Sequence, residues 1–101
     1  MNIEIRYFDD CPNWLEVEES VTGLIASLGI DADVSLTRVD TPEKAAQLSF
    51  RGSPTLLIDG TDPWGDPDAP IGLSCRIYRT GAGFAGSPSR PQIEAALQAA
   101  L

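Results

Sequence analysis

The sequence predicts an α/β protein with a four-stranded mixed sheet and helices on both faces. Its 101 residues are expected to form strand, helix, strand, helix, strand, strand and helix, in that order. Apolar residues alternate with polar ones in residues 3–7, and they recur at steps of three and four in residues 14–28. A strand–helix–strand unit makes its two strands parallel through a right-handed crossover. The last two strands should form an antiparallel hairpin, which makes the sheet mixed.

The first strand and the first helix follow from this change of period. The alternation in residues 3–7 predicts a strand that ends near Phe8. Pro12 suits the first helical turn, because its missing N–H needs no partner there, and Gly29 ends the helix. The apolar side chains on one face of this helix are Trp14, Val17, Val21, Leu24, Ile25 and Leu28.

The later elements are predicted from shorter signals. Thr41 is a good N-cap with a proline directly after it, which predicts the start of a helix. Residues 61–72 form a long predicted loop, and loops of this length are often functional or mobile. The expected elements are a strand over 34–39, a helix from 41 to about 50, a strand over 55–58, the loop 61–72, a strand over 75–78 and a helix from 89.

Length and composition favour a single domain, residues 1–101, and exclude several functions. The net charge of −8 argues against nucleic-acid binding. With no histidine and only two cysteines, we expect no metal site and no cofactor. No apolar run approaches the ~18 residues of a membrane helix, and the N-terminus lacks a signal-peptide core. We therefore expect a cytoplasmic protein without a membrane partner; the sequence does not indicate its oligomeric state.

Two short motifs stand at the ends of predicted elements. Cys11-Pro12-Asn13-Trp14 joins the first strand to the first helix, and Ser53-Pro54-Thr55 opens the third strand. On this order of elements they resemble the small, glutaredoxin-sized members of the thioredoxin-like superfamily. The resemblance implies a thioredoxin-like fold in which Cys11 is the nucleophile and Pro54 is a cis-proline beside it. Trp14 stands where a C-x-x-C motif has its second cysteine, so dithiol activity at that motif is not implied.

The same resemblance suggests a substrate groove beside the nucleophile. If Pro54 is cis, the backbone of Ser53 would offer hydrogen-bonding groups to an extended thiol substrate, which would bind by strand addition. The expected substrate contacts are therefore Pro12, Trp14, Ser53, Pro54 and Thr55. Trp14 also lies on the apolar stripe of the first helix, which favours packing in or near the core over a substrate contact.

The two cysteines are the main candidates for chemistry. The N-terminus of a helix favours a thiolate at Cys11, whereas the neighbouring Asp9 and Asp10 disfavour it, so we expect an accessible but only moderately activated thiol. Cys75 is a possible resolving thiol if its Cα lies within ~7 Å of that of Cys11. In the predicted sheet, however, Cys75 should lie near the far edge, buried and inert, unless the loop 61–72 folds back.

Three functions stay open on the sequence. In the first, Cys11 attacks a disulfide as a monothiol oxidoreductase would, with proteins or low-molecular-weight thiols as partners. In the second, the domain only binds a protein through its sheet edge, the loop 61–72 or Trp64, and Cys11 is vestigial. In the third and least favoured, the thiolates capture a soft metal.

Overall fold

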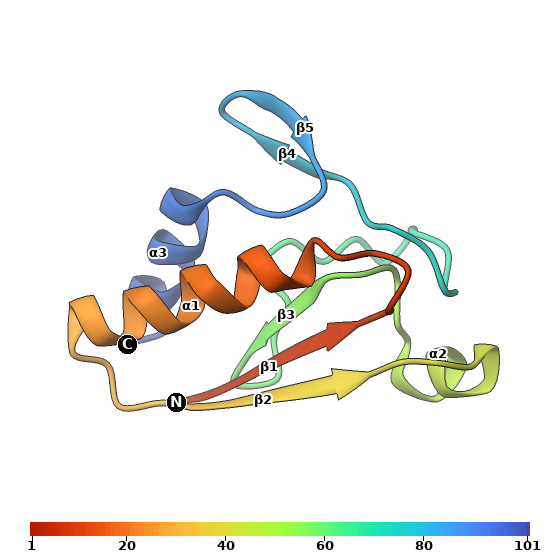
Figure 1. The fold of residues 1–101 in the computed structure, drawn as a ribbon, viewed down its shortest axis with the longest axis horizontal. Coiled ribbons are helices and arrows are strands. Elements are labelled where there is room, and N and C mark those ends of the chain that lie inside the picture. Colours follow the sequence, from red (N-terminus) through yellow and green to blue (C-terminus); the bar gives the residue numbers. More distant parts are fainter.

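The computed structural model describes all residues, 1–101, as an α/β protein with three helices and two separate sheets (Figure 1). No helix in it has both the length and the apolar character needed to cross a membrane. The elements in chain order are β1 (Asn2–Tyr7), α1 (Trp14–Leu28), β2 (Asp33–Arg38), α2 (Pro42–Leu48), β3 (Thr55–Ile58), β4 (Tyr78–Thr80), β5 (Gly83–Ala85) and α3 (Arg90–Ala99).

The main sheet has three strands in the order β2-β1-β3. β1 and β2 are parallel, with Ile5 opposite Leu36, as expected for a strand–helix–strand unit. β1 and β3 are antiparallel, with Ile5 opposite Leu56 and Arg6 opposite Thr55. The end of β1 that leads toward Cys11 therefore lies beside the beginning of β3.

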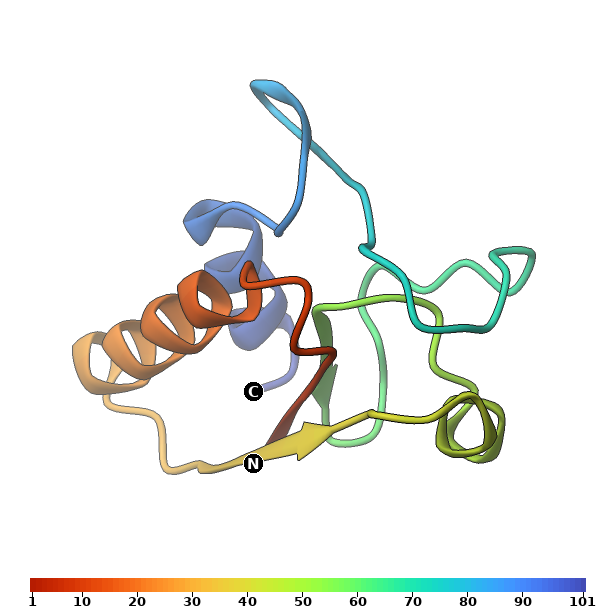
Figure 2. The same cartoon turned by 45° about the vertical axis from the view of Figure 1, so that its right-hand side comes forward.

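The prediction of a four-stranded mixed sheet is wrong, and with it the thioredoxin-like arrangement of seven elements. Residues 75–78, the expected fourth strand, do not run along β3. Cys75 makes one parallel bridge with Ser53, and Tyr78 begins a separate two-stranded hairpin, β4–β5. Figures 1 and 2 show this hairpin standing away from the rest of the molecule.

The return path of the chain explains the difference. After β3 the backbone turns back, and the Gly72 N–H donates to the Phe50 carbonyl at 3.0 Å. By residue 74 the chain has thus already returned to the start of β3. It continues past Ser53 in the same direction as β3 instead of folding back along it.

The expectation of helices on both faces is also wrong. α1 and α3 cover one face of the main sheet (Figure 2), whereas α2 packs in a separate cluster of Val39, Ala45 and Phe50. The opposite face is bordered by loop residues 60–67 and forms a cavity of about 540 Å³. The buried residues of the main core are Ile3, Ile5, Val17, Val21, Leu24, Ile30, Leu56, Ile58, Ile93 and Leu97.

α1 follows a turn that contains Pro12 and ends at a glycine. α1 begins at Trp14, so Pro12 lies in the turn before the helix and not in its first turn. The Leu15 N–H donates to the Pro12 carbonyl at 3.1 Å, which joins that turn to the helix. Gly29, with φ of 65°, ends α1 in the left-handed conformation that glycine adopts without strain.

Candidate functional site

Cys11 and Cys75 form a disulfide across 64 residues of sequence, with their Cα atoms 5.8 Å apart. They are the two cysteines of the chain. The expectation that Cys75 lies at the far edge of the sheet is therefore wrong. It rested on an antiparallel fourth strand, whereas residues 74–76 in fact run beside Ser53, at the end of the sheet where β1 leads toward Cys11.

Ser53 ties together the two segments that bear the cysteines. Its side-chain Oγ accepts a hydrogen bond from the Phe8 N–H at 3.0 Å, just before Cys11. Its own N–H donates to the Ser74 carbonyl at 2.8 Å, and its carbonyl accepts from the Arg76 N–H at 2.9 Å. The backbone groups that were expected to receive a substrate strand are thus occupied by the chain's own residues 74–76.

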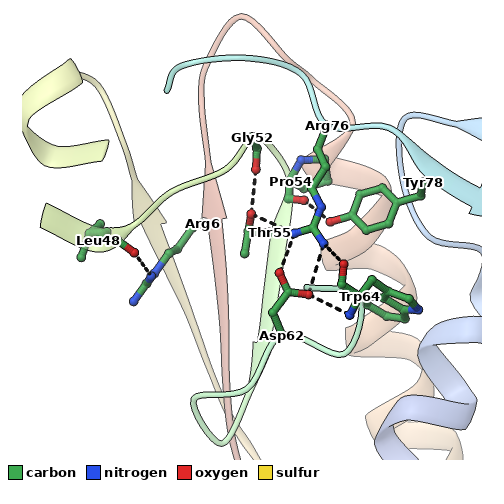
Figure 3. Close-up of polar contacts among 9 residues, drawn as sticks. All are labelled: Arg6, Leu48, Gly52, Pro54, Thr55, Asp62, Trp64, Arg76 and Tyr78. Carbon is green, nitrogen blue, oxygen red and sulfur yellow. Dashed lines mark hydrogen bonds and ion pairs between the residues drawn. The ribbon is translucent and has the colours of Figure 1, made fainter. Parts of the chain in front are cut away.

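The Ser53–Pro54 peptide bond is cis, a point that the local sequence left open. Pro54 is buried, and its carbonyl accepts a hydrogen bond from the Tyr78 hydroxyl (Figure 3). Burial raises the pKa of Tyr78 well above its usual 10.0, against the opposing effect of the Arg76 charge. Tyr78 therefore keeps its proton at ordinary pH and remains a donor to Pro54.

Gly52 allows the two segments to approach closely. Its φ is 117°, a conformation that residues with a side chain rarely adopt. A Cβ atom at this position would lie 2.9 Å from the Cβ of Arg76 and 3.2 Å from its Cα. Only glycine fits between the start of β3 and the segment that contains Cys75.

Arg76 fixes the segment after Cys75 to the preceding loop (Figure 3). Its guanidinium pairs with Asp62 at 2.6 Å and donates to the Trp64 carbonyl at 2.5 Å. The side chains of Arg76 and Asp62 are only 11% and 20% exposed, so solvent screens this pair less than a surface pair. The guanidinium also lies over the Tyr78 ring, 4.6 Å from its centroid.

The two sulfur-bearing residues differ in exposure. Cys11 is 1% exposed, whereas Cys75 is exposed and borders a cavity of about 270 Å³. The larger cavity on the open sheet face contains neither cysteine, and its Glu4 and Arg6 side chains pair with each other at 2.9 Å. The Arg6 hydrogen bond lowers the pKa of Glu4 below its usual value, with help from the Thr37 hydroxyl.

The structure places the other predicted contact residues differently. Trp14 stacks on Tyr7 with centroids 4.3 Å apart and packs against the main core, the role that its helical spacing favoured. Pro12 is exposed, whereas Thr55 is buried and donates to the Gly52 carbonyl at 2.7 Å. Neither Pro12 nor Trp14 borders a cavity.

Trp64 and the loop around it are held in place rather than free. The Trp64 ring meets the Tyr78 ring edge to face, with centroids 5.8 Å apart, and the backbone N–H of Trp64 donates to Asp62 at 2.9 Å.

Four residues at this site were not predicted from the sequence: Gly52, Asp62, Arg76 and Tyr78. Of these, only Gly52 had a local signal, because it directly precedes Ser53-Pro54. The contacts of the other three join residues that are far apart in sequence.

No group of three or more His, Cys, Asp or Glu side chains is placed so that it could hold a metal ion. No protein-family model, curated protein or solved structure matches this chain.

Proposed function

We propose that this chain is a thiol–disulfide redox protein that alternates between the Cys11–Cys75 disulfide and two thiols. The observation that supports it is the disulfide's position. It joins the cysteine before α1 to a segment paired with Ser53, next to the cis Ser53–Pro54 bond. In the superfamily that the two motifs resemble, the nucleophilic thiol and the cis-proline lie together in this way. Cys75 would act as the second cysteine of the couple, because Trp14 occupies the position of the second cysteine in a C-x-x-C motif.

The surroundings of the pair suit exchange chemistry. Cys11 lies shortly before α1, and the positive end of the helix favours a thiolate there. Cys75 is exposed to an approaching partner. The partner would be a protein or a low-molecular-weight thiol or disulfide, and each cycle would move two electrons and two protons.

We also propose a cytoplasmic location. In that compartment disulfides are usually transient, and they serve catalysis or redox sensing more often than stability. A pair of cysteines that meets in the folded chain from 64 residues apart is therefore better explained there as a redox couple than as a permanent cross-link.

A turnover assay tests the proposed function. The oxidised protein would be added in catalytic amounts to dithiothreitol and bis(2-hydroxyethyl) disulfide, and the release of 2-mercaptoethanol followed. We expect a rate that rises in proportion to protein concentration and falls to the background rate in the Cys11→Ser/Cys75→Ser double variant. Equal rates for the native protein and the folded double variant would rule out a redox catalyst.

Soft-metal binding is a second candidate, because the reduced pair would present two thiolates on Cα atoms only 5.8 Å apart. Thiolates select soft ions such as Cu(I) and Hg(II). If this is the function, the reduced protein binds one Hg(II) per chain, and Cys75→Ser weakens binding by more than about tenfold. Equal affinity of the two proteins would exclude a shared two-thiolate site.

A further inference from the structure

The two cysteines of the disulfide are not equally exposed. A thiolate must reach one sulfur of a disulfide and displace the other. Cys11 is 1% exposed and lies on none of the cavities of the molecule. Cys75 is exposed and lies on the cavity of about 270 Å³ between the loop of Trp64 and the segment of Ile77.

The approach to Cys11 is closed by the chain itself. An extended substrate beside Cys11 would have to pair with the backbone of Ser53, but the N–H and the carbonyl of that residue are already bonded to Ser74 and Arg76. Arg76 in turn is held by Asp62, so the blocking segment is anchored on both sides of Cys75.

Resting on the redox function proposed above, we infer that Cys75 is the sulfur that exchanges with the outside thiol and that Cys11 is its buried partner. This order is the reverse of the one that the family resemblance implies, in which Cys11 is the nucleophile. The burial of Cys11 and the exposure of Cys75 are the observations that reverse it.

A substrate thiolate attacks Cys75 Sγ, a new sulfur–sulfur bond forms there, and the bond to Cys11 breaks. Cys11 leaves with the electron pair as a thiolate near the N-terminus of α1 and then takes up a proton. A second substrate thiolate attacks the substrate sulfur of the mixed disulfide and releases Cys75 as a thiolate. Two substrate thiols are oxidised to one disulfide, and the protein disulfide is reduced to two thiols.

The substrate class follows from the same geometry. The cavity beside Cys75, at about 270 Å³, lies below the ~300–1,000 Å³ of ordinary ligand sites. Its charged lining residues are two arginines and two aspartates, and of these Arg76 and Asp62 neutralise each other. Since strand pairing at Ser53 is also blocked, a small thiol fits this route better than an extended polypeptide.

Trapping of the mixed disulfide tests the inference on the native, oxidised protein. The protein is exposed briefly to N-acetylcysteine amide, quenched with acid, alkylated, digested and mapped by mass spectrometry. We expect the adduct on Cys75 and the alkyl group on Cys11. An adduct mainly on Cys11 would overturn the inference while leaving a redox function intact. If the folded protein is not reduced at all, although the denatured protein is, the proposed function itself fails.

Two single-cysteine variants compare the reactivity of Cys75 with that of Cys11 in proteins where an adduct cannot move from one cysteine to the other. Cys11→Ser keeps Cys75 and Cys75→Ser keeps Cys11, and circular dichroism establishes that both are folded. With the disulfide of N-acetylcysteine amide, Cys11→Ser should form its adduct at least ~10-fold faster than Cys75→Ser. The reverse order would overturn the inference.

The approach route and the substrate size have their own controls. Ile77 borders the cavity and is 72% exposed, whereas Phe84 is 74% exposed on the hairpin and away from the cavity. Ile77→Glu should slow attack by a thiolate several-fold through charge repulsion, and Phe84→Glu should not. A peptide with one central cysteine should react at least ~10-fold more slowly than N-acetylcysteine amide. Equal effects of the two substitutions, or equal rates of the two thiols, would contradict entry of a small thiol by this cavity.

Discussion

Gly52 lies so close to Arg76 that a Cβ atom on residue 52 would stand 2.9 Å from the Cβ of Arg76. This contact lets the start of β3 and the segment of Cys75 run side by side, with Ser53 bonded to both neighbours of Cys75. The disulfide thus depends on a backbone arrangement that excludes a side chain at one position.

Gly52→Ala should therefore lower the free energy of unfolding of the oxidised protein by more than about 2 kcal/mol, since it adds a clash to an unfavourable φ. Gly60→Ala is the matched control, because Gly60 also has a positive φ, 83°, but nothing within 4 Å of a Cβ. That substitution should cost only about 1 kcal/mol. Denaturant unfolding measures both, and equal losses would contradict the close approach at Gly52.

Removal of the Arg76 charge should loosen the segment that holds Cys75. Arg76→Met leaves the Asp62 carboxylate, at 20% exposure, without its ion-pair partner and should cost about 2–3 kcal/mol. Dithiothreitol should then reduce the disulfide faster in this variant than in the native protein. Arg79→Met, which removes an exposed arginine that lies over Phe84, is the control and should change little. Similar reduction rates for the two variants would argue against the anchoring role of Arg76.

Tyr78→Phe removes the hydroxyl that donates to the Pro54 carbonyl and should cost about 1–2 kcal/mol at pH 8. The folded-state pKa of Tyr78 is raised by burial, so the native protein loses stability as the pH rises above the usual 10.0, where the unfolded chain ionises. The stability difference between native protein and variant should therefore shrink above pH 10. Urea unfolding at pH 8 and above pH 10 tests this. Tyr7→Phe is the control, because the Tyr7 ring stacks on Trp14. If this stability difference stays constant or grows above pH 10, Tyr78 is not a buried hydrogen-bond donor to Pro54.

Glu4→Gln should cost roughly 0.5–1 kcal/mol at pH 7, because Glu4 accepts hydrogen bonds from Arg6 and from the Thr37 hydroxyl. The pKa of Glu4 is lowered in the folded state, so its contribution is present above the usual 4.5 and is lost as the pH falls through the folded value. The difference between native protein and variant should thus vanish in acid. Glu19→Gln on the exposed side of α1 is the control, and a pH-independent loss at Glu4 would refute the assignment.

The elements with a strong local period could be predicted from the sequence. The alternation around Ile3 and Ile5 gave β1, and the stripe that includes Val17 and Val21 gave α1; all four side chains are buried in the main core. These patterns report which side of a strand or helix faces the core, so no knowledge of distant residues is needed.

The partner of a strand is not local information, and there the prediction failed. Tyr78 does begin a strand, but that strand pairs with β5 in a hairpin of its own rather than with β3. The path between β3 and Cys75 is fixed by contacts such as Arg76 with Asp62 and Ser53 with Ser74, none of which has a periodic signature. The same path brings Cys75 to Cys11, which is why their pairing could not be derived from spacing. The motifs around Cys11 and Pro54, by contrast, could be read from the sequence, and both lie at the end of the sheet where the disulfide forms.

The proposed redox couple consists of Cys11 and Cys75 in the folded chain. The most direct test is a redox titration of the native chain in thiol–disulfide buffers, quenched with acid and read as alkylated thiols by mass spectrometry. We expect a reversible two-electron transition above about −300 mV, with the chain folded on both sides of it. If the disulfide is reduced only well below that potential, or only when the chain unfolds, the bond is a structural cross-link and not a redox couple.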